Sequence, residues 1–523
     1  MIDHLDYIQD LGFTAILISP VVENIPDNTK YGEAYHGYWP NNMYSLNEHF
    51  GTAEDLQELA SELHKRDMYL MVDVVINDMA QAMDGTMADH RTPTIDWSRL
   101  IPFNEDKYYH SYCNITDWAD PKDYQNCWFG VDPVALPDLK TEDNTVVSMI
   151  QEWVSGLVGN YSIDGLRIDA TKHVDDAYLV KFTEASGVFT MGEVYSGDTQ
   201  LVCRYEDFVT GLLNFPLYFP IIQAFTAGDM PGLANKVRTV QQGCKDFRRL
   251  GTFVENHDLP RFASVIDDLT VSLNARLDIS VLTRQQLAKN AMAFNILSDG
   301  IPIGISPPSM TLCHAKKLSV LQGQEQHMPG NYSPYNRAPL WSTGYNTEGS
   351  LYTLTATLNR LRNHALRIDN HYASNHSQEL YVDGSTYATR KGPEGVQIVS
   401  VFSNQGSKGG KYQLALQGGF APGMDVMEIL GCSRLTSNEV GNITVEMGAG
   451  EPKIFFPMSQ LNGSGLCGFT NQKKSSTINS EPEDEPEPEP ESGQKSSADH
   501  NLVSFYLVIF YIAFAAIGYF YLA

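Results

Sequence analysis

Short apolar runs alternate with amphipathic helical stretches from residue 1 to about residue 300. The runs 13–20 (FTAILISP) and 68–75 (MYLMVDVV) are mostly apolar and lack the polar alternation of a half-exposed strand. The stretch 53–66 places its apolar residues at helical spacing, and 149–161 does the same further on. Strands buried on both faces and separated by helices predict a parallel sheet, and the number of repeats favours a barrel over an open sheet.

Polar residues follow each of these apolar runs. The series continues with 163–171 (IDGLRIDAT), 188–195 (VFTMGEVY), 211–215 (GLLNF) and 250–258 (LGTFVENHD). In (β/α)8 barrels the carboxyl ends of the strands carry the chemistry. The pattern therefore predicts an α/β fold, a (β/α)8 TIM barrel, with candidate functional residues at the carboxyl ends of its strands.

Two intervals depart from this alternation and predict separate units. Residues 78–139 contain Tyr, Pro, Asp and two Cys without helix–strand alternation, which indicates an irregular inserted subdomain after the third strand. Residues 372–467 turn to an all-β pattern, which indicates a C-terminal antiparallel β-sandwich domain. The catalytic barrel then comprises residues 1–77 and 140–371.

The C-terminal end predicts attachment to a membrane. Residues 468–501 are acidic and rich in Pro and Ser, typical of an extended stalk, and residues 502–523 carry no charge and are long enough to span a bilayer. Small residues, a short polar stretch and a hydrophobic tail, in that order, suit a GPI-attachment signal, whose tail is replaced by lipid; a true tail anchor is the alternative. We therefore expect the secretory pathway and a cell-surface location at the plasma membrane or cell wall.

The N-terminal segment does not supply the targeting signal that such a location needs. MIDHLDYIQDLGF has acids throughout and neither a basic nor an apolar region of the kind found in signal peptides. We therefore expect the natural start to lie upstream of Met1. Six N-x-S/T sequons are compatible with a glycosylated protein in an oxidising compartment: Asn114, Asn160, Asn331, Asn375, Asn442 and Asn462.

The net charge argues against binding of nucleic acid, and the cysteine spacing argues against a zinc site. The 523 residues carry a formal charge of −27, of which seven negative charges lie in 481–491, so little is available to neutralise the phosphates of a nucleic acid. The seven Cys residues form no CxxC pair, so a zinc site has no support.

Three carboxylates end three different apolar runs: Asp169, Glu193 and Asp258. Each alone could be structural, and Asp169 could simply pair with Arg167 on the same strand. Three acids converging at one end of a barrel cost energy unless they have a function. Glycoside cleavage needs such a set, since one carboxylate attacks and a second, with raised pKa, protonates the leaving oxygen. Asp73, inside an apolar run, is predicted to be a buried structural acid.

Four motifs carry a family resemblance. DVVIN (73–77), GLRIDATKH (165–173), GEVY (192–195) and FVENHD (253–258) resemble, in order and spacing, the signature regions of glycoside hydrolase family 13. With YGEAYHGYW, LPDL and GQEQH, the chain from residue 1 to about 467 resembles the fungal α-amylases, close to their GPI-anchored α-amylase and α-glucanotransferase relatives.

The resemblance implies a role for each matching residue. Asp169 would be the nucleophile, Glu193 the general acid/base and Asp258 the transition-state stabiliser. Tyr38 would stack on the sugar. The other substrate-binding positions that it implies are His36, Trp39, Arg167, Lys172, His173, His257 and Arg337.

The resemblance also implies a calcium site and three disulfides. The calcium ligands would be Asn77, Asp138 and the main-chain carbonyl of His173, all oxygen donors as a hard cation requires. Gln125 replaces a further carboxylate ligand, which should weaken the site. The implied disulfides are Cys113–Cys127, Cys203–Cys244 and Cys432–Cys467, with Cys313 left over.

Several positions depart from the family pattern. The family's first strand is missing from this chain, and residues 270–285 and 305–321 resemble loop insertions or retained introns. Asp78 stands where the family has a sugar-contacting His, and Ser333 replaces an acid before Asn336-Arg337.

Three functional hypotheses follow from the motifs and these departures. The leading one is a retaining, endo-acting α-1,4-glucan hydrolase at the cell surface, acting as a monomer on α-glucan or maltooligosaccharides. The alternatives are an α-1,4-glucanotransferase that acts on cell-wall α-glucan, and an inactive glucan-binding wall protein.

Overall fold

A parallel sheet lies at the centre of the protein, as the apolar runs predict. The computed structural model describes residues 1–83, 93–265, 281–303 and 323–470. Within these residues seven parallel strands pair in chain order: β1 (Ala15–Ile18), β4 (Tyr69–Val74), β7 (Gly165–Ile168), β8 (Phe189–Gly192), β9 (Gly211–Leu213), β10 (Leu250–Thr252) and β11 (Ile301–Pro302). All residues of β1 and β7 are buried, which explains why their sequences show no polar alternation. The curled sheet with its outer helices confirms the barrel-type fold; β1 and β11 are its two edges among the described residues.

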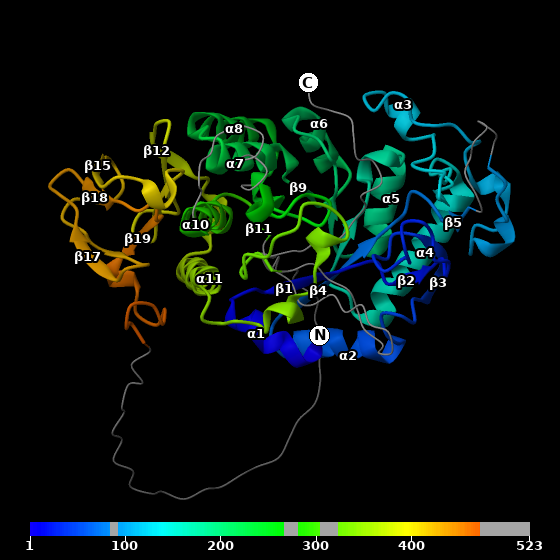
Figure 1. Ribbon diagram of the computed structural model, residues 1–523, viewed down its shortest axis with the longest axis horizontal. Coiled ribbons are helices and arrows are strands. Elements are labelled where there is room, and N and C mark those ends of the chain that lie inside the picture. Colours follow the sequence, from blue (N-terminus) through cyan, green and yellow to red (C-terminus); the bar gives the residue numbers. More distant parts are fainter. Residues whose placement is uncertain (84–92, 266–280, 304–322, 471–523) are drawn as a thin grey trace, which may run out of the picture.

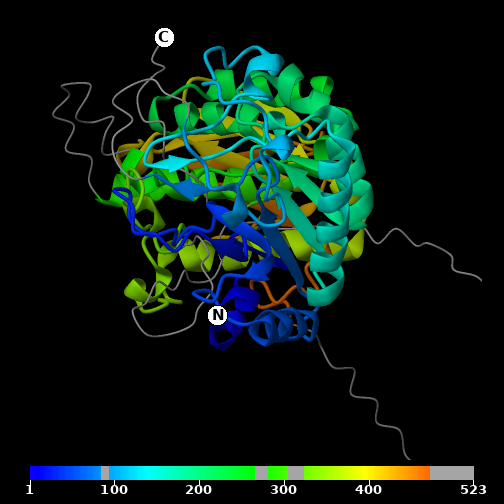
Figure 2. The ribbon, with the colours of Figure 1, turned by 90° about the vertical axis from the view of Figure 1, so that its right-hand side faces the viewer.

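Helices connect the strands and cover the outside of the sheet (Figure 1, Figure 2). They are α1 (Leu5–Asp10), α2 (Ala53–His64), α4 (Asn144–Tyr161), α5 (Asp176–Ser186), α6 (Thr199–Arg204), α7 (Phe215–Thr226), α8 (Met230–Gly243), α10 (Val281–Leu297) and α11 (Ser350–Ile368). Several begin at an N-cap whose side chain accepts backbone N–H bonds, such as Thr52 before α2, Asp143 before α4 and Asp175 before α5. These caps satisfy donors that the first turn of a helix leaves unpaired.

The predicted insertions are only partly covered by the described residues. Residues 281–285, the end of the segment 270–285, form the first turns of α10, so this part belongs to a barrel helix and not to a loop. The rest of that segment and 305–321 lie outside the described residues, as does most of the stalk and the whole tail 502–523. Among the described residues no helix is long and apolar enough to cross a membrane.

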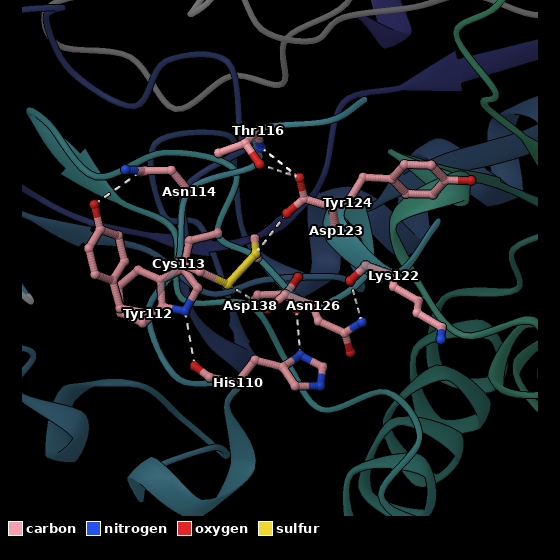
Figure 3. Close-up of a disulfide and its surroundings, with 12 residues drawn as sticks. His110, Tyr112, Cys113, Asn114, Thr116, Lys122, Asp123, Tyr124, Asn126 and Asp138 are labelled. Carbon is pink, nitrogen blue, oxygen red and sulfur yellow. Dashed lines mark hydrogen bonds and ion pairs between the residues drawn. A yellow bond between two sulfur atoms is a disulfide. The ribbon is translucent and has the colours of Figure 1, made fainter. Parts of the chain in front are cut away.

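An irregular segment follows β4, where the inserted subdomain was predicted (Figure 3). It contains β5 (Gln81–Ala82), β6 (Val134–Ala135) and α3 (Pro121–Tyr124), and the Cys113–Cys127 disulfide. A small apolar cluster ties it to the loop and hairpin β2 (Val22–Asn24) and β3 (Pro40–Leu46): Ile25, Ala34, Trp39, Ala80, Val134 and Leu136. The subdomain therefore packs at the carboxyl end of the barrel strands, where β4 ends.

Antiparallel strands make up the C-terminal domain, as predicted. A six-stranded sheet has the order β12 (Gln378–Val382), β13 (Thr386–Lys391), β14 (Ile398–Ser403), β19 (Lys453–Pro457), β16 (Asp425–Glu428), β17 (Ser433–Thr436), and β15 (Tyr412–Leu416) pairs with β18 (Ile443–Met447). Apolar residues of both sheets share one core. The Cys432–Cys467 disulfide lies in this domain and Cys203–Cys244 in the barrel, so all three implied pairings are confirmed.

Candidate active site

Arg167 lies at the centre of the candidate site, fully buried in β7. Its Nη1 is 2.9 Å from Asp73 Oδ1 of β4 and also contacts Asp169, which directly follows β7. Its Nη2 is 2.6 Å from Oε2 of Glu193, which directly follows β8. One guanidinium therefore brings together carboxylates from three adjacent strands, two of them predicted catalytic residues.

The balance of charge around Arg167 sets the protonation of the site. One positive charge faces three carboxyl groups, so full ionisation would leave two uncompensated negative charges in a buried place. Burial raises the pKa of Glu193, and the neighbouring Asp169 raises it further against the opposing effect of Arg167. Asp73 accepts hydrogen bonds from Arg167 and from the Tyr38 hydroxyl at 2.6 Å, which is the structural role predicted for it. Glu193 is therefore the member of the set suited to carry a proton.

The segment after β7, which begins with Asp169, is hydrogen-bonded to Glu193 after β8. Ala170 has a left-handed conformation, with φ 45°, that costs a non-glycine residue about 1–3 kcal/mol and often marks a functional site. Its N–H donates to Glu193 Oε2 at 3.1 Å. The Thr171 hydroxyl accepts from the Glu193 N–H and donates to the Ile168 carbonyl, each at 2.8 Å. Sequence reasoning missed Thr171, because only the register of β7 and β8 shows that it bridges them.

Asp258 comes from the end of β10 and lies among basic groups. Its Oδ2 is 3.2 Å from His257 Nε2 and its Oδ1 is 3.5 Å from Arg337 Nη2. Burial raises the pKa of Asp258, and the charge of Glu193 raises it further. Burial and Arg337 lower the pKa of His257, so the imidazole is neutral. The third predicted carboxylate therefore belongs to the same electrostatic group as Glu193.

The loop after β2 supplies Tyr38, His36 and Trp39, with different surroundings for each. The Tyr38 ring is stacked parallel to His257 at 6.0 Å, and its N–H donates to His36 Nδ1 at 3.0 Å. Trp39 is only 2% exposed and belongs to the apolar cluster under the inserted subdomain. The Trp39 ring therefore packs the loop against the subdomain, and its contact with sugar stays a prediction.

Lys172 and His173 face the inserted subdomain. Lys172 Nζ lies 5.6 Å from the centre of the Trp118 ring and 5.1 Å from that of Tyr124, at cation–π distance. His173 is buried, its Nδ1–H donates to the Tyr124 carbonyl at 2.9 Å, and burial lowers its pKa to about 3. The His173 ring therefore helps hold the subdomain against the strand ends. Burial lowers the pKa of Lys172, and the nearby charge of Glu193 opposes this shift.

Two of the predicted calcium ligands, Asn77 and Asp138, lie on segments that pair with each other at the end of β4. Asp138 pairs with Asp78 through an isolated antiparallel bridge, and the Asn77 carbonyl accepts from Leu139 N–H at 2.9 Å. The side-chain Oδ1 atoms of Asn77 and Asp78 are buried without a hydrogen-bond partner in the described structure. Unpaired buried oxygens are costly unless a cation or water satisfies them. The donor set therefore fits a hard cation.

Two neighbours modify this set. His110 Nδ1–H donates to Asp138 Oδ2 at 2.7 Å (Figure 3). Gln125 Nε2 donates to the Val174 carbonyl at 2.8 Å and points to that of Lys172, so its amide replaces the charge of a carboxylate with a hydrogen bond. A separate cluster of Cys203, Glu206 and Cys244 is no metal site, because both sulfurs are engaged in a disulfide.

A sheet of this topology with three acids at the carboxyl ends of its strands is typical of glycoside hydrolases, and comparisons with known proteins agree. Residues 1–304 match the family described as "Alpha amylase, catalytic domain", and residues 379–475 match "Alpha-amylase, domain C". The chain therefore belongs to the α-amylase family and is a glycoside hydrolase of the α-amylase type.

Individual relatives support this assignment. "Alpha-amylase 1" of Schwanniomyces occidentalis is 44% identical over 469 residues, which cover 89% of this chain and 84% of the relative. "Alpha-amylase mde5" of Schizosaccharomyces pombe is 36% identical, with 89% and 82% covered. The solved structure of an α-amylase from Malbranchea cinnamomea matches with a TM-score of 0.79 and 42% identity, covering 89% of this chain and 90% of the other.

Proposed function

We propose that this protein is a retaining, endo-acting hydrolase of α-1,4-glucan. The observation that carries the proposal is Arg167, whose two terminal nitrogens contact Asp169 and Glu193. Two carboxyl groups on one guanidinium are close together, which favours the separation of about 5 Å used by retaining enzymes over the roughly 6.5–9.5 Å of inverting ones.

The chemistry follows from the two protonation states. Asp169 attacks the anomeric carbon, the glycosidic C–O bond breaks, and the Glu193 proton goes to the leaving oxygen. Glu193 then takes a proton from a water molecule, whose oxygen bonds to the anomeric carbon while the bond from that carbon to Asp169 breaks, which releases the product and free Asp169. Asp258, held by Arg337 and His257, would bind the sugar ring as positive charge develops on it.

Around this centre, other predicted residues would hold the glucan. Tyr38 presents a ring beside His257, and His36 supports the Tyr38 backbone. Lys172 and His173 lie on the Glu193 side, which is the side of the leaving group. These assignments agree with a flat, hydroxylated substrate held between aromatic rings and charged donors.

A bound calcium ion is part of the proposal. Asn77, Asp138 and the His173 carbonyl would hold it, and it would tie the end of β4 to the inserted subdomain without taking part in bond cleavage. Addition of a chelator should lower the melting temperature by several degrees, and calcium should restore it. Scanning calorimetry of chelated and calcium-loaded protein measures this, and identical melting curves would refute the site.

Transfer to a sugar acceptor is the second candidate. Tyr195 follows Glu193 by two residues, is 48% exposed, and lies against Phe215 at 4.8 Å between ring centres. The charges of Asp258 and Glu193 both raise its pKa after the effect of burial, so it lies near the reacting groups. An exposed ring on the leaving-group side suits stacking of an acceptor sugar in place of water. Asp78, in place of a family His that contacts the sugar in the cleavage subsite, is a further departure from the hydrolase pattern.

Product lengths distinguish the candidates. Incubation with maltoheptaose should give only shorter products for a hydrolase, longer ones as well for a transferase, and no change for an inactive glucan-binding protein. Asp169→Asn should abolish either activity while leaving the melting curve intact, since Arg167 keeps Asp73 and Glu193 as partners. Turnover by this variant would refute the mechanism.

The cellular part of the proposal is a monomeric protein at the cell surface, held through residues 502–523 or a lipid that replaces them. The uncharged sequence of this tail supports it. Release of the protein from intact cells by a phosphatidylinositol-specific phospholipase would support a lipid anchor, and retention would favour a spanning tail.

A further inference from the structure

Two tyrosine rings lie exposed beside the candidate active site without a role in it. Tyr332 is 63% exposed and Tyr335 is 62% exposed, the two highest values among the Phe, Trp and Tyr side chains of the described residues. Their ring centres are 5.3 Å apart and their planes are nearly perpendicular, at 86°. Large exposed rings cost free energy in water, so an adjacent pair next to a substrate site calls for a binding role.

The segment that carries the two rings is fixed to the catalytic residues. Asn336 is buried and its Nδ2 donates to the carbonyls of His257 and Leu259, at 2.7 and 3.1 Å. Arg337 Nε donates to the His257 carbonyl at 3.2 Å, and Arg261 Nε donates to the Asn336 carbonyl at 2.6 Å. Tyr335 is thus only one residue from a position locked onto the strand end that presents Asp258.

The other side of the segment touches the Tyr38 loop. Ser333, between the two tyrosines, has its Oγ 2.9 Å from the hydroxyl of Tyr35, which precedes His36. The rings therefore lie where the loop after β2 meets the end of β10. Glu193 and Lys172, which face the leaving group, come instead from the ends of β8 and β7. The pair accordingly lies on the side of the substrate that stays attached to the enzyme.

We propose that Tyr332 and Tyr335 form an additional binding platform for the donor part of a long α-glucan, several sugars beyond the cleaved bond. The inference rests on the proposed function and adds a chain-length preference to it. Sugar rings have apolar faces that stack on aromatic side chains, and a perpendicular pair offers two faces to a curved chain. Short substrates would not reach the platform, so it would select longer ones.

The test compares a double variant, Tyr332→Ala with Tyr335→Ala, with the unchanged protein. We expect kcat/KM for maltoheptaose to fall about tenfold while that for maltotriose stays within about twofold, since one or two ring contacts are worth roughly one factor of ten. With a label on the reducing end of maltoheptaose, the labelled product should become longer, because fewer sugars are held on the donor side. An unchanged or shorter labelled product would overturn the proposal.

Two matched variants separate stacking from altered folding. Tyr332→Phe with Tyr335→Phe keeps both rings and should retain the preference for long chains. Tyr44→Ala removes a ring that is 56% exposed on β3 near Glu152 of α4, and it should change nothing. The assays use deglycosylated protein, because Asn331 precedes Tyr332 in a sequon.

A binding measurement tests the tyrosine platform without relying on catalytic activity. Titration calorimetry of maltoheptaose against the unchanged protein and the double Ala variant should show about tenfold weaker binding for the variant. If the unchanged protein is inactive on all glucans, the proposed function fails while this measurement still decides the platform. Equal affinities would overturn it.

Discussion

Arg167 contacts three buried carboxyl groups, those of Asp73, Asp169 and Glu193. Loss of its guanidinium would remove the positive charge that balances them. Arg167→Gln should lower the free energy of unfolding by about 3–5 kcal/mol, the usual cost of breaking a buried ion pair. Urea denaturation measures it. Arg238→Gln, which breaks an exposed pair with Glu379, should cost less than about 1 kcal/mol. Equal effects of the two substitutions would contradict this role of Arg167.

The protonation of Glu193 predicts a pH dependence of activity. Because burial raises the pKa of Glu193 above its ordinary 4.5, the acid keeps its proton to higher pH, and kcat/KM should fall as pH rises through that raised value. Glu193→Gln should lose about 10²–10⁴-fold activity on maltooligosaccharides. Maltosyl fluoride needs no protonation of its leaving group, so its cleavage should fall far less. Equal losses on both substrates would contradict the acid role.

For single residues, the sequence predicted the three carboxylates of the candidate site better than the aromatic side chains near them. Asp169, Glu193 and Asp258 could be singled out because each ends an apolar run, a feature readable in one dimension. The packing of Trp39 in the apolar cluster under the inserted subdomain could not be predicted, because only the fold shows which side chains surround it. Tyr332 and Tyr335 carry no periodic signal, since exposure of a loop side chain depends on what surrounds it.

Helix α1 is joined to the segment after β11 through a buried carboxyl group. Tyr7 O–H donates to Glu325 Oε1 at 2.7 Å, Gly323 N–H donates to Oε2 at 3.2 Å, and Gln326 Nε2 donates to the Tyr7 oxygen at 2.7 Å. Burial raises the pKa of Glu325 from 4.5 to about 7. The native protein therefore holds a proton that the unfolded chain releases at lower pH.

A pH-dependent stability follows from Glu325. Its contribution is fully present below about pH 4.5 and is lost as pH rises through about 7, a change of about 3 kcal/mol for a shift of this size. In Glu325→Gln the group no longer titrates, so the free energy of unfolding should depend less on pH between 4.5 and 7. Urea denaturation across this range measures it, with Glu446→Gln on the exposed face of β18 as control. Parallel pH profiles for unchanged protein and Glu325→Gln would show the assignment to be wrong.

For whole elements, prediction worked where a repeating pattern extended over several residues. The strands β4, β7 and β8 fall inside the apolar runs predicted for them, because burial on both faces leaves a continuous apolar signal. The start of helix α10 could not be predicted. Residues 281–285 resemble part of an insertion in the sequence, but in the structure they form the first residues of the helix. Contacts such as Tyr7 with Glu325 join positions 318 residues apart and leave no local signature.

A buried ion pair lies among the contacts that join the barrel to the C-terminal domain, which is on the left of Figure 1. Lys391 Nζ, at the end of β13, lies 2.6 Å from Asp299 Oδ1, just before β11. Asp299 also accepts from Gln241 Nε2 of α8 at 2.7 Å and from Ser377 N–H at 2.9 Å. Burial alone would raise the pKa of Asp299, but Lys391 and these donors hold it below its usual value. The carboxylate is therefore ionised and links two elements of the barrel to the β domain.

This pair predicts how the two domains depend on each other. Lys391→Met would leave the charge of Asp299 buried with only neutral donors, and should lower the free energy of unfolding by about 3–5 kcal/mol. Adding Asp299→Asn removes the uncompensated charge, so the double variant should recover at least half of that loss. Activity on maltoheptaose should stay unchanged in folded protein, because the pair lies apart from Arg167 and its acids. Urea denaturation of both variants measures the coupling. If Lys391→Met lowers the free energy of unfolding no more than Arg238→Gln does, apolar packing, and not this ion pair, joins the domains.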